Sequence, residues 1–269
     1  MAAAITEQGG DENGLWLVAN AGPDIEPLDD HEWIIALRSR LGLAVGHPCL
    51  CQHRRATAAG VHNGKRCLTP LDAHGRHALA CMTGGARTTL HNDLCRLVHR
   101  ACCAAGLRSQ REVVVPALAT AKRAEPRIDI GAWGHPGLPH LRLDVTVADP
   151  AADRNAGGTD RAERSKATKY GIPRGGVGVT GLALALTGRL GTQFDRLLRH
   201  LAGLARAERA ALGQESSRHL RQWHTQISIT LARFVAAAIS SAFADAPVGL
   251  TAGNPAAAAV QSPAACLHP

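Results

Sequence analysis

Two short segments near the middle of the chain alternate between apolar and polar residues. In residues 141–147 the odd positions are apolar and fall on one face of a strand, while Asp144 and its polar neighbours fall on the other. Residues 127–130 repeat this pattern around Asp129. The Gly- and Pro-rich residues 131–139 between them predict a turn, so we expect an antiparallel hairpin that brings both carboxylates to one polar face.

Apolar residues recur at helical spacing in other parts of the chain. The spacing predicts helices over residues 29–41, 88–105, 193–211 and 217–243, and strands over residues 112–115 and 182–186. Residues 149–165 read either as a polar loop or as the start of a charged helix that runs to Tyr170. The resulting order of helix, strand, strand, strand, helix, strand and helix predicts an α/β core rather than a helical bundle.

Residues 46–85 are different, because they are rich in Gly, His, Cys and Arg and have no amphipathic period. Such a segment cannot build a hydrophobic core of its own, and a bound metal would explain how it stays folded. Zn²⁺ takes four Cys or His ligands in a tetrahedron. The preferred ligands are Cys51, Cys67, His77 and Cys81, with Cys49, His74 and His91 as substitutes.

The alternative for any cysteine here is that it is a small buried hydrophobe, since free cysteines are among the most buried residues. That interpretation suits Cys95, Cys102 and Cys103, which lie on the helix that follows. The chain is expected to divide into a disordered segment 1–27, a helix plus zinc-stapled segment 28–86, the α/β core 87–192, C-terminal helices 193–245 and an Ala- and Pro-rich disordered tail 246–269.

Charge and composition narrow the partners and the compartment. The chain has 30 Lys and Arg against 22 Asp and Glu, for a net charge of +8, which permits a polyanionic partner such as DNA. Aromatic residues make up only 3%, which argues against stacking of single-stranded bases as the main binding device. The sequence lacks a signal peptide, and no apolar run is judged long enough for a membrane. We therefore expect an intracellular protein with no membrane partner, whose cysteines are thiols or metal ligands.

Asp129 and Asp144 carry the candidate chemistry. Two carboxylates held close together repel each other, and the usual relief is Mg²⁺ or Mn²⁺ bound through oxygen ligands. The plainer alternative is that both are solvated surface residues. The Gly-rich residues 175–181 lack the ending of a phosphate loop, and nothing supports a Ser or Cys hydrolase.

Several motifs follow one another in a recognisable order. They are Cys49-Leu-Cys51, Leu71-Asp-Ala-His-Gly-Arg-His-Ala-Leu-Ala-Cys81, Leu90-His-Asn, Ile128-Asp129, Leu143-Asp-Val-Thr-Val-Ala-Asp-Pro150, Lys169-Tyr170 and Thr187-Gly-Arg-Leu-Gly191. Across about residues 30–245 the chain resembles the C-terminal part of the reverse-transcriptase polyproteins of site-specific non-LTR retrotransposons. The part in question is their zinc knuckle and restriction-like endonuclease segment, a relative of the PD-(D/E)XK nucleases.

The resemblance implies a restriction-endonuclease-like core, a mixed sheet flanked by helices, that nicks target DNA so that a 3′-hydroxyl can prime reverse transcription. It implies that Asp129 and Asp144 hold the divalent metal, Mg²⁺ or Mn²⁺, that Glu112 adds a ligand, and that Lys166 or Lys169 lies near the attacking water. The implied partners are DNA and element RNA, and the implied location is nuclear.

The chain departs from that family at several positions. Thr146 stands where a lysine usually follows the second acid, Pro126 is displaced from the first acid, and Ala185 or Leu186 replaces an acidic residue. Residues 52–66 separate Cys51 from Cys67. These departures support a second hypothesis, a zinc-containing nucleic-acid-binding module whose nuclease site has decayed. Its phosphate contacts would come from Arg87, Arg96, Arg100, Arg108 and Arg111.

The sequence has no polymerase-type acidic pair in an aromatic-rich palm. Reverse transcription itself is therefore not expected of this chain, and its oligomeric state is not predicted.

Overall fold

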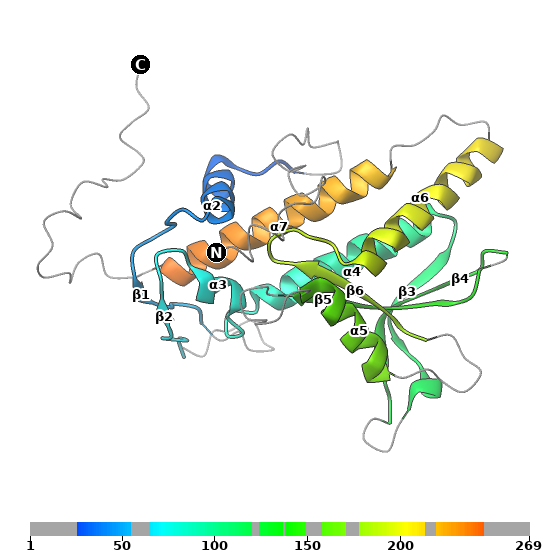
Figure 1. Ribbon diagram of the computed structural model, residues 1–269, viewed down its shortest axis with the longest axis horizontal. Coiled ribbons are helices and arrows are strands. Elements are labelled where there is room, and N and C mark those ends of the chain that lie inside the picture. Colours follow the sequence, from blue (N-terminus) through cyan, green and yellow to red (C-terminus); the bar gives the residue numbers. More distant parts are fainter. Residues whose placement is uncertain are drawn as a thin grey trace, which may run out of the picture.

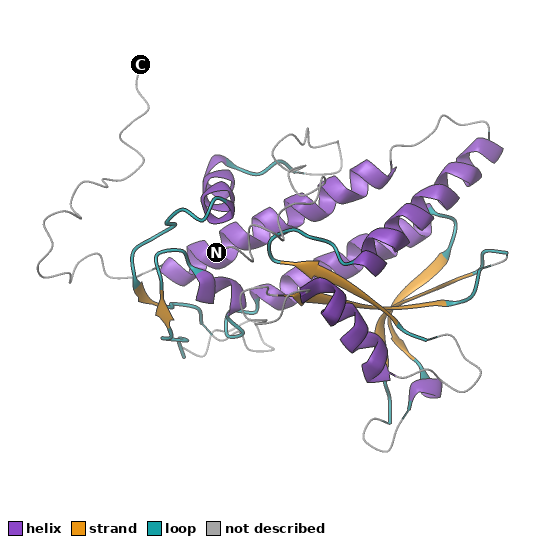
Figure 2. Cartoon of the chain, viewed as in Figure 1, coloured by secondary structure: helices purple, strands orange, loops and turns teal. Residues whose placement is uncertain are grey.

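A mixed β-sheet with helices on both faces forms the centre of the fold (Figure 1). The structure is a computed structural model that describes residues 26–54, 65–119, 124–136, 138–148, 158–170, 178–212 and 219–244. The segments 1–25 and 246–269, predicted to be disordered, lie outside these residues. The predicted α/β class, with a mixed sheet flanked by helices and a helical C-terminal part, is confirmed (Figure 2).

The sheet has the strand order β3-β4-β5-β6, with β3 at Arg108–Val114, β4 at Arg127–Trp133, β5 at Leu141–Ala148 and β6 at Thr180–Ala185. The pairs β3–β4 and β4–β5 are antiparallel, so the predicted hairpin around the two acids is confirmed. Strand β6 is parallel to β5, and helix α5 (Gly158–Tyr170) lies between them in the sequence. A parallel pair requires such a crossover, because the chain must return to the same end of the sheet.

The two faces of the sheet are covered by different helices. Helices α4 (Ala86–Ala104) and α6 (Thr192–Ala211) pack against the face that carries Leu182 and Leu184, and α7 (His219–Phe243) packs over both helices. Helix α5 covers the other face, where a side chain at Gly181 would meet Glu163 (Figure 1). Asp144, on the face of β5 that α5 covers, is therefore enclosed and only 3% exposed. The expectation that Asp144 is a solvated surface residue is wrong.

The predicted helix over residues 88–105 forms as α4, with its predicted apolar face buried from Leu90 to Ala101 and with Gly106 after its end at a φ of +76°. Its cap at Ala105 and the glycine beyond it are typical of a helix C-terminus. A short 3-10 helix, η2 (Pro116–Leu118), follows β3.

Helix α2 (Asp30–Arg40) begins where the sequence predicts, because Asp29 and Glu32 form a capping box. The helical spacing of Trp33, Ile34, Leu37 and Leu41 predicts that these residues form its buried face, and this prediction is wrong in part. Trp33 and Ile34 are exposed, and Ala36 is the residue buried against α7. A small residue allows the two helices to approach closely, which the apolar periodicity alone did not reveal.

Helix α7 is the longest described helix and, by length and composition, is apolar enough to cross a membrane. The expectation that every apolar run is too short to cross a membrane therefore does not hold for α7 by length and composition. More than half of the most apolar window of α7 is buried inside the protein, against α2, α3, α4 and α6. Its apolar surface is therefore used for packing between the sheet layer and the Cys-rich segment.

The Cys-rich segment contains the short strands β1 (Cys49–Leu50) and β2 (Pro70–Leu71) and the short helix α3 (Arg76–Ala80). It docks on the C-terminal end of α7 (Figure 1). The amide of Gln52 donates to the Ala242 carbonyl at 2.9 Å, and His53 Nε2 lies 2.9 Å from the Ala238 carbonyl. This segment, α4, α7 and the sheet share one hydrophobic core.

Candidate functional site

An antiparallel hairpin brings Cys51 and Cys67 together although fifteen residues separate them in the sequence. Cys49 pairs with Leu71, and the isolated bridge between Arg54 and Arg66 has the same register. The Cys51 amide donates to the Thr69 carbonyl, and the Cys67 amide donates to the His53 carbonyl, both at 2.9 Å. Residues 52–54 and 65–66 therefore continue the antiparallel pairing beyond the two cysteines, and the thiols stay together.

Helix α3 supplies the other half of the cluster. His77 lies in its first turn and Cys81 caps its C-terminus, so the two side chains are four residues apart on one helical face. The backbone turns sharply into this helix at Gly75, which has a φ of +65°. A side chain at Gly75 would also come within 3.3 Å of Ile239 on α7, so the glycine sets both the turn and the close packing.

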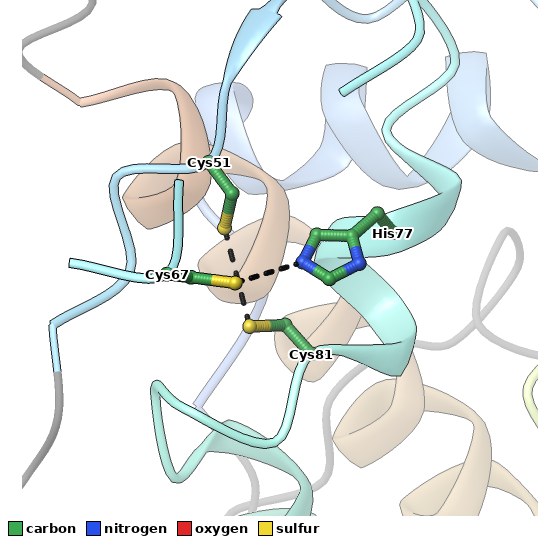
Figure 3. Close-up of side chains that lie close together, drawn as sticks. All are labelled: Cys51, Cys67, His77 and Cys81. Atoms are coloured by element: carbon green, nitrogen blue, oxygen red, sulfur yellow. Dashed lines mark hydrogen bonds between the residues drawn. The ribbon is translucent and has the colours of Figure 1, made fainter. Parts of the chain in front are cut away.

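The ligand atoms of Cys51, Cys67, His77 and Cys81 all lie within 4.8 Å of one another (Figure 3). Cys51 Sγ is 4.0 Å from Cys81 Sγ, and Cys67 Sγ is 3.2 Å from His77 Nε2. In a tetrahedral zinc site the corresponding separations are about 3.8 Å between sulfurs and about 3.6 Å between sulfur and nitrogen. This Cys3His cluster could therefore hold a metal ion such as zinc, and it is the set of ligands that the sequence analysis preferred.

The two hairpin thiols differ in acidity. Burial raises the pKa of the Cys51 thiol to about 12, with the neighbouring thiols Cys81 and Cys67 adding to the effect. Burial acts in the same direction on Cys67, but hydrogen bonds from Thr69, His77 and Cys81 outweigh it and lower the Cys67 pKa to about 6. Cys67 is thus prepared to act as a thiolate ligand.

The three substitute ligands lie elsewhere. Cys49 is half-buried on β1 and is not part of the cluster, nor is His74, which precedes α3. His91 lies on α4 beside Asp129. Cys49 and Cys51 are two residues apart and so share one face of the strand, but Cys49 pairs with Leu71, whereas Cys51 lies opposite Thr69 and therefore nearer to Cys67.

The two acids predicted to be catalytic lie where β4 and β5 separate. The ladder between these strands ends at the pair Ile130↔Leu143, and one further step in the same register places Asp129 opposite Asp144. There Asp129 Oδ2 accepts the Val145 amide at 2.6 Å, so a side chain replaces a ladder carbonyl. The carboxylate is thereby held in the gap between the strands.

Asp144 is held by helix α5. Lys166 Nζ donates to its Oδ1 and the Tyr170 hydroxyl donates to its Oδ2. Lys166 and Tyr170 are four residues apart and therefore lie on the same face of α5. Lys169 donates to the Tyr170 hydroxyl at 3.4 Å, and its ammonium lies 4.8 Å from the centre of the Tyr170 ring. Of the two lysines expected near the site, Lys166 donates directly to Asp144.

Asp129 is held by helix α4, since His91 Nε2 lies 3.4 Å from its Oδ1. Burial alone would raise the pKa of Asp129, but His91, the Val145 amide and Lys166 outweigh it and lower that pKa. The same contact with Asp129 raises the pKa of His91. A carboxylate and an imidazolium stabilise each other here, so both groups favour their charged forms near neutral pH.

Glu112 occupies the next position in this row of acids. On either side of Glu112, Arg111 pairs with Ile130 and Val113 pairs with Ile128. This register places Glu112 opposite Asp129, but these two residues do not pair in the ladder. Its φ of +53° is a left-handed conformation that costs a non-glycine residue of the order of 1 kcal/mol or more. The Glu112 side chain is exposed. Together with Asp129 and Asp144 it raises the pKa of Cys95, after burial, so these groups share one electrostatic environment.

Sequence reasoning missed three groups in this region. The motif comparison gives no role to Tyr170, although the spacing of four residues between its position and that of Lys166 predicts that the two side chains share one face of a helix. His91 was considered only as a zinc ligand, and nothing in the local sequence indicates its contact with Asp129. Glu163 is 4% exposed and accepts the amides of Gln193 and Phe194 at the start of α6, a role that no sequence pattern reveals.

The arginines proposed to contact phosphates fall into two groups. Arg87 donates to the Val147 carbonyl at 2.8 Å and so ties α4 to β5, and the Nε atom of Arg111 is buried. Arg96, Arg100 and Arg108 are exposed along α4 and the start of β3. Only this second group is placed to meet a polyanion.

No family model and no curated protein matches this chain.

Proposed function

We propose that this protein is a divalent-metal-dependent DNA endonuclease with a restriction-endonuclease-like core. The observation that carries the proposal is the meeting of Asp129, Asp144 and Lys166 at the point where β4 and β5 separate. Two carboxylates and a lysine from three different elements form this group, within reach of solvent on the Asp129 side, whose side chain is 17% exposed. An acid with a lowered pKa, such as Asp129, that lies beside a second carboxylate and a lysine is typical of functional sites.

The architecture supports the same proposal. The core is a mixed sheet flanked by helices, as the family resemblance implies. In chain order it consists of a helix, three antiparallel strands, a crossover helix and a fourth strand that is parallel to the third. The first acid lies on the second strand of this sheet and the second acid on the third strand. Thr146 stands where the family has its lysine, and Lys166 compensates by reaching Asp144 from α5.

The donor set suits a hard cation. Asp129 and Asp144 offer carboxylate oxygens, which Mg²⁺ and Mn²⁺ prefer, and Glu112 is the third acid in the row. A metal held there would polarise the phosphodiester and favour ionisation of a water molecule. Lys166 would then stabilise negative charge on the reacting phosphate, and Tyr170 would orient the Asp144 carboxylate.

The Cys3His cluster has a structural role in this proposal, with Zn²⁺ as its metal. All four positions are filled by protein ligands, which is typical of structural rather than catalytic zinc. It lies between the β1–β2 hairpin and α3, which dock on α7. Zinc would therefore stabilise the segment that has the least core of its own.

Nicking of a supercoiled plasmid tests the proposal. The zinc-loaded protein is incubated with plasmid in Mg²⁺ or Mn²⁺, beside Asp129→Ala, Asp144→Ala and Lys166→Met. Lys169→Met is the comparison variant, because Lys169 lies on the same helix, is exposed and donates to the Tyr170 hydroxyl at 3.4 Å, whereas Lys166 donates to Asp144 itself. Loss of one charge-stabilising group commonly costs about 100-fold or more in rate, so we expect a loss of that size for Lys166→Met and little change for Lys169→Met.

Nicking that survives both aspartate substitutions would refute this site. A wild-type protein that leaves the plasmid intact but retards it in a gel in a salt-sensitive way would refute the nuclease. That result would support the second hypothesis, a zinc-containing module that binds DNA without cleaving it. The burial of Asp144 beneath Lys166 and Tyr170 is the observation that favours this alternative.

A further inference from the structure

Helix α4 directs a second, smaller group of metal-ligating side chains at Asp129. His91 and Cys95 lie four residues apart and so share one face of the helix. The ligand atoms of His91, Cys95 and Asp129 all lie within 4.8 Å of one another. Cys95 Sγ is 3.6 Å from His91 Nε2, and His91 Nε2 is 3.4 Å from Asp129 Oδ1.

These separations match the edges of a metal coordination tetrahedron. With zinc bonds of about 2.3 Å to sulfur and about 2.05 Å to nitrogen or oxygen, a tetrahedral ion holds S and N about 3.6 Å apart and N and O about 3.4 Å apart. Two of the three separations thus already match those of ligands around one ion, and the third, between Cys95 and Asp129, is no longer than 4.8 Å. A contact between His91 and Asp129 alone would not require the Cys95 thiol to lie at this distance from the same His91 nitrogen.

We propose that His91, Cys95 and Asp129 form a second metal site that binds a borderline-soft divalent cation such as Zn²⁺. One nitrogen, one sulfur and one oxygen ligand favour such an ion over Mg²⁺, which selects oxygen alone. The three protein ligands leave a fourth position open, as in catalytic and regulatory zinc sites. The ion's binding does not depend on the proposed nuclease activity, whereas its effect on nicking rests on that function.

The surroundings of the site support an ion rather than three unrelated side chains. Asp129 Oδ2 is fixed by the Val145 amide, so Oδ1 is the oxygen that faces His91. Such an outer contact orients a ligating carboxylate. Cys95 is 1% exposed, whereas the side chains of His91 and Asp129 are 29% and 17% exposed. A bound ion would therefore have a dry thiolate behind it and solvent in front.

The site shares Asp129 with the proposed Mg²⁺ site, and Zn²⁺ bound to this carboxylate would weaken it as a ligand for a second cation, because two divalent ions repel each other at short range. Zinc bound to His91 and Cys95 would draw Asp129 towards α4, away from Asp144 on β5, which Lys166 of α5 holds. Zinc would then inhibit nicking by competing for Asp129. The inhibition would require the thiol of Cys95, which takes no part in the proposed cleavage.

Cobalt spectroscopy tests the binding. Co²⁺ is added to full-length protein whose Cys3His cluster has been filled with Zn²⁺, and the thiolate-to-cobalt charge-transfer absorption is recorded. We expect one absorbing site in the wild type and at least an ~100-fold weaker affinity in Cys95→Ser and in His91→Ala, because removal of even an outer-shell partner costs about 10–100-fold. His91→Ala is the second variant because His91 is partly exposed and its loss is easier for the fold to accept than a change at buried Cys95.

Cys102→Ser is the matched control, since Cys102 is buried on the same helix two turns away. It should keep the absorption. No absorption in the wild type, or an absorption that persists in Cys95→Ser and is lost in Cys67→Ser, overturns the proposal, because the second pattern places cobalt in the Cys3His cluster.

The nicking assay then separates the two proposals. Each protein's rate in Mg²⁺ is normalised to its own value without zinc, and added Zn²⁺ should inhibit the wild type at concentrations that leave Cys95→Ser uninhibited. Equal inhibition of both refutes the competition. A wild type that binds cobalt at Cys95 but never nicks refutes the nuclease and leaves the second metal site standing.

Discussion

Replacement of Glu163 by alanine should destabilise the protein strongly, because this one buried carboxylate connects α5, β6 and α6. Glu163 Oε1 accepts the Ala183 amide at 3.3 Å and the Phe194 amide at 3.0 Å, and Oε2 accepts the Gln193 amide at 2.9 Å. The last two amides belong to the first turn of α6, where no residue of the helix itself can accept them. The carboxylate therefore caps α6 from a distant helix.

The cost can be worked out from the donors that would lose their partner. Ala183 and Phe194 are fully buried, so water cannot replace the carboxylate there, and each unsatisfied donor costs about 1–3 kcal/mol. We expect Glu163→Ala to lose about 4 kcal/mol of unfolding free energy, a large share of the 5–15 kcal/mol of a typical domain. Urea denaturation measures the loss. Glu208→Ala, an exposed glutamate on α6, is the control and should change stability by less than about 0.5 kcal/mol.

The pH dependence gives a second reading of the same residue. Burial raises the pKa of Glu163 despite its three hydrogen bonds. A raised folded-state pKa stabilises the fold below the unfolded-state value, near pH 4.5, and this contribution is lost as the pH rises through the folded-state pKa. The stability of the wild type relative to Glu163→Gln should therefore fall as the pH rises above about 4.5 and through the raised pKa of Glu163. A loss below about 1 kcal/mol in Glu163→Ala, or a relative stability that rises with pH, would refute this account of the cap.

Three further perturbations test other parts of the structure. A side chain at Gly181 would lie 2.5 Å from the Glu163 carbonyl and 2.8 Å from Lys166 Cβ. Gly181→Ala should therefore push α5 off the sheet, lower the free energy of unfolding in urea by about 1–3 kcal/mol and lower the nicking rate. A wild-type unfolding free energy together with a wild-type nicking rate would contradict the packing. Cys67→Ser should release zinc, measured by metal analysis, and lower the melting temperature, whereas Cys103→Ser, at an exposed position, should do neither; equal melting temperatures would remove the structural role of the cluster. Arg100→Ala and Arg108→Ala are each added to the Asp129→Ala variant, and DNA affinity is measured by gel shift at several salt concentrations. Each arginine substitution should reduce the slope of log affinity against log salt by about 0.9, the value for one lost phosphate contact. Unchanged slopes would exclude the exposed arginines of α4 and β3 as the DNA contact.

Local signals in the sequence were enough for most elements of the core. Alternation predicted the strands around Asp129 and Asp144 and the turn between them, and the helical spacing of apolar residues predicted a helix that begins at Asp29, one residue before the observed start of α2. These patterns depend on neighbours within a few residues, because strand and helix periodicity follow from backbone geometry. The same patterns were weaker at helix faces. Trp33 and Ile34 have the right spacing for burial but remain exposed, since the closeness of α7 favours the small Ala36.

The ligand set of the Cys3His cluster was predictable because soft ligands are rare and recur there within a short window. The means of bringing Cys51 to Cys67 was not, because the length of the hairpin loop between them carries no signal of its register. Likewise, a lysine near the site was expected, but the choice of Lys166 over Lys169 depends on which face α5 presents to β5.

By itself the sequence determined the α/β class, the acidic hairpin and the residues able to bind metal, because composition and periodicity act locally along the chain. Only the tertiary structure decided that Asp144 is enclosed by Lys166 and Tyr170, that Glu163 caps a distant helix, and that His91 and Cys95 approach Asp129. Each of those contacts joins elements that are distant in sequence. Their geometry follows from how the helices pack on the sheet, which depends on side-chain volumes across the whole core and on no single segment.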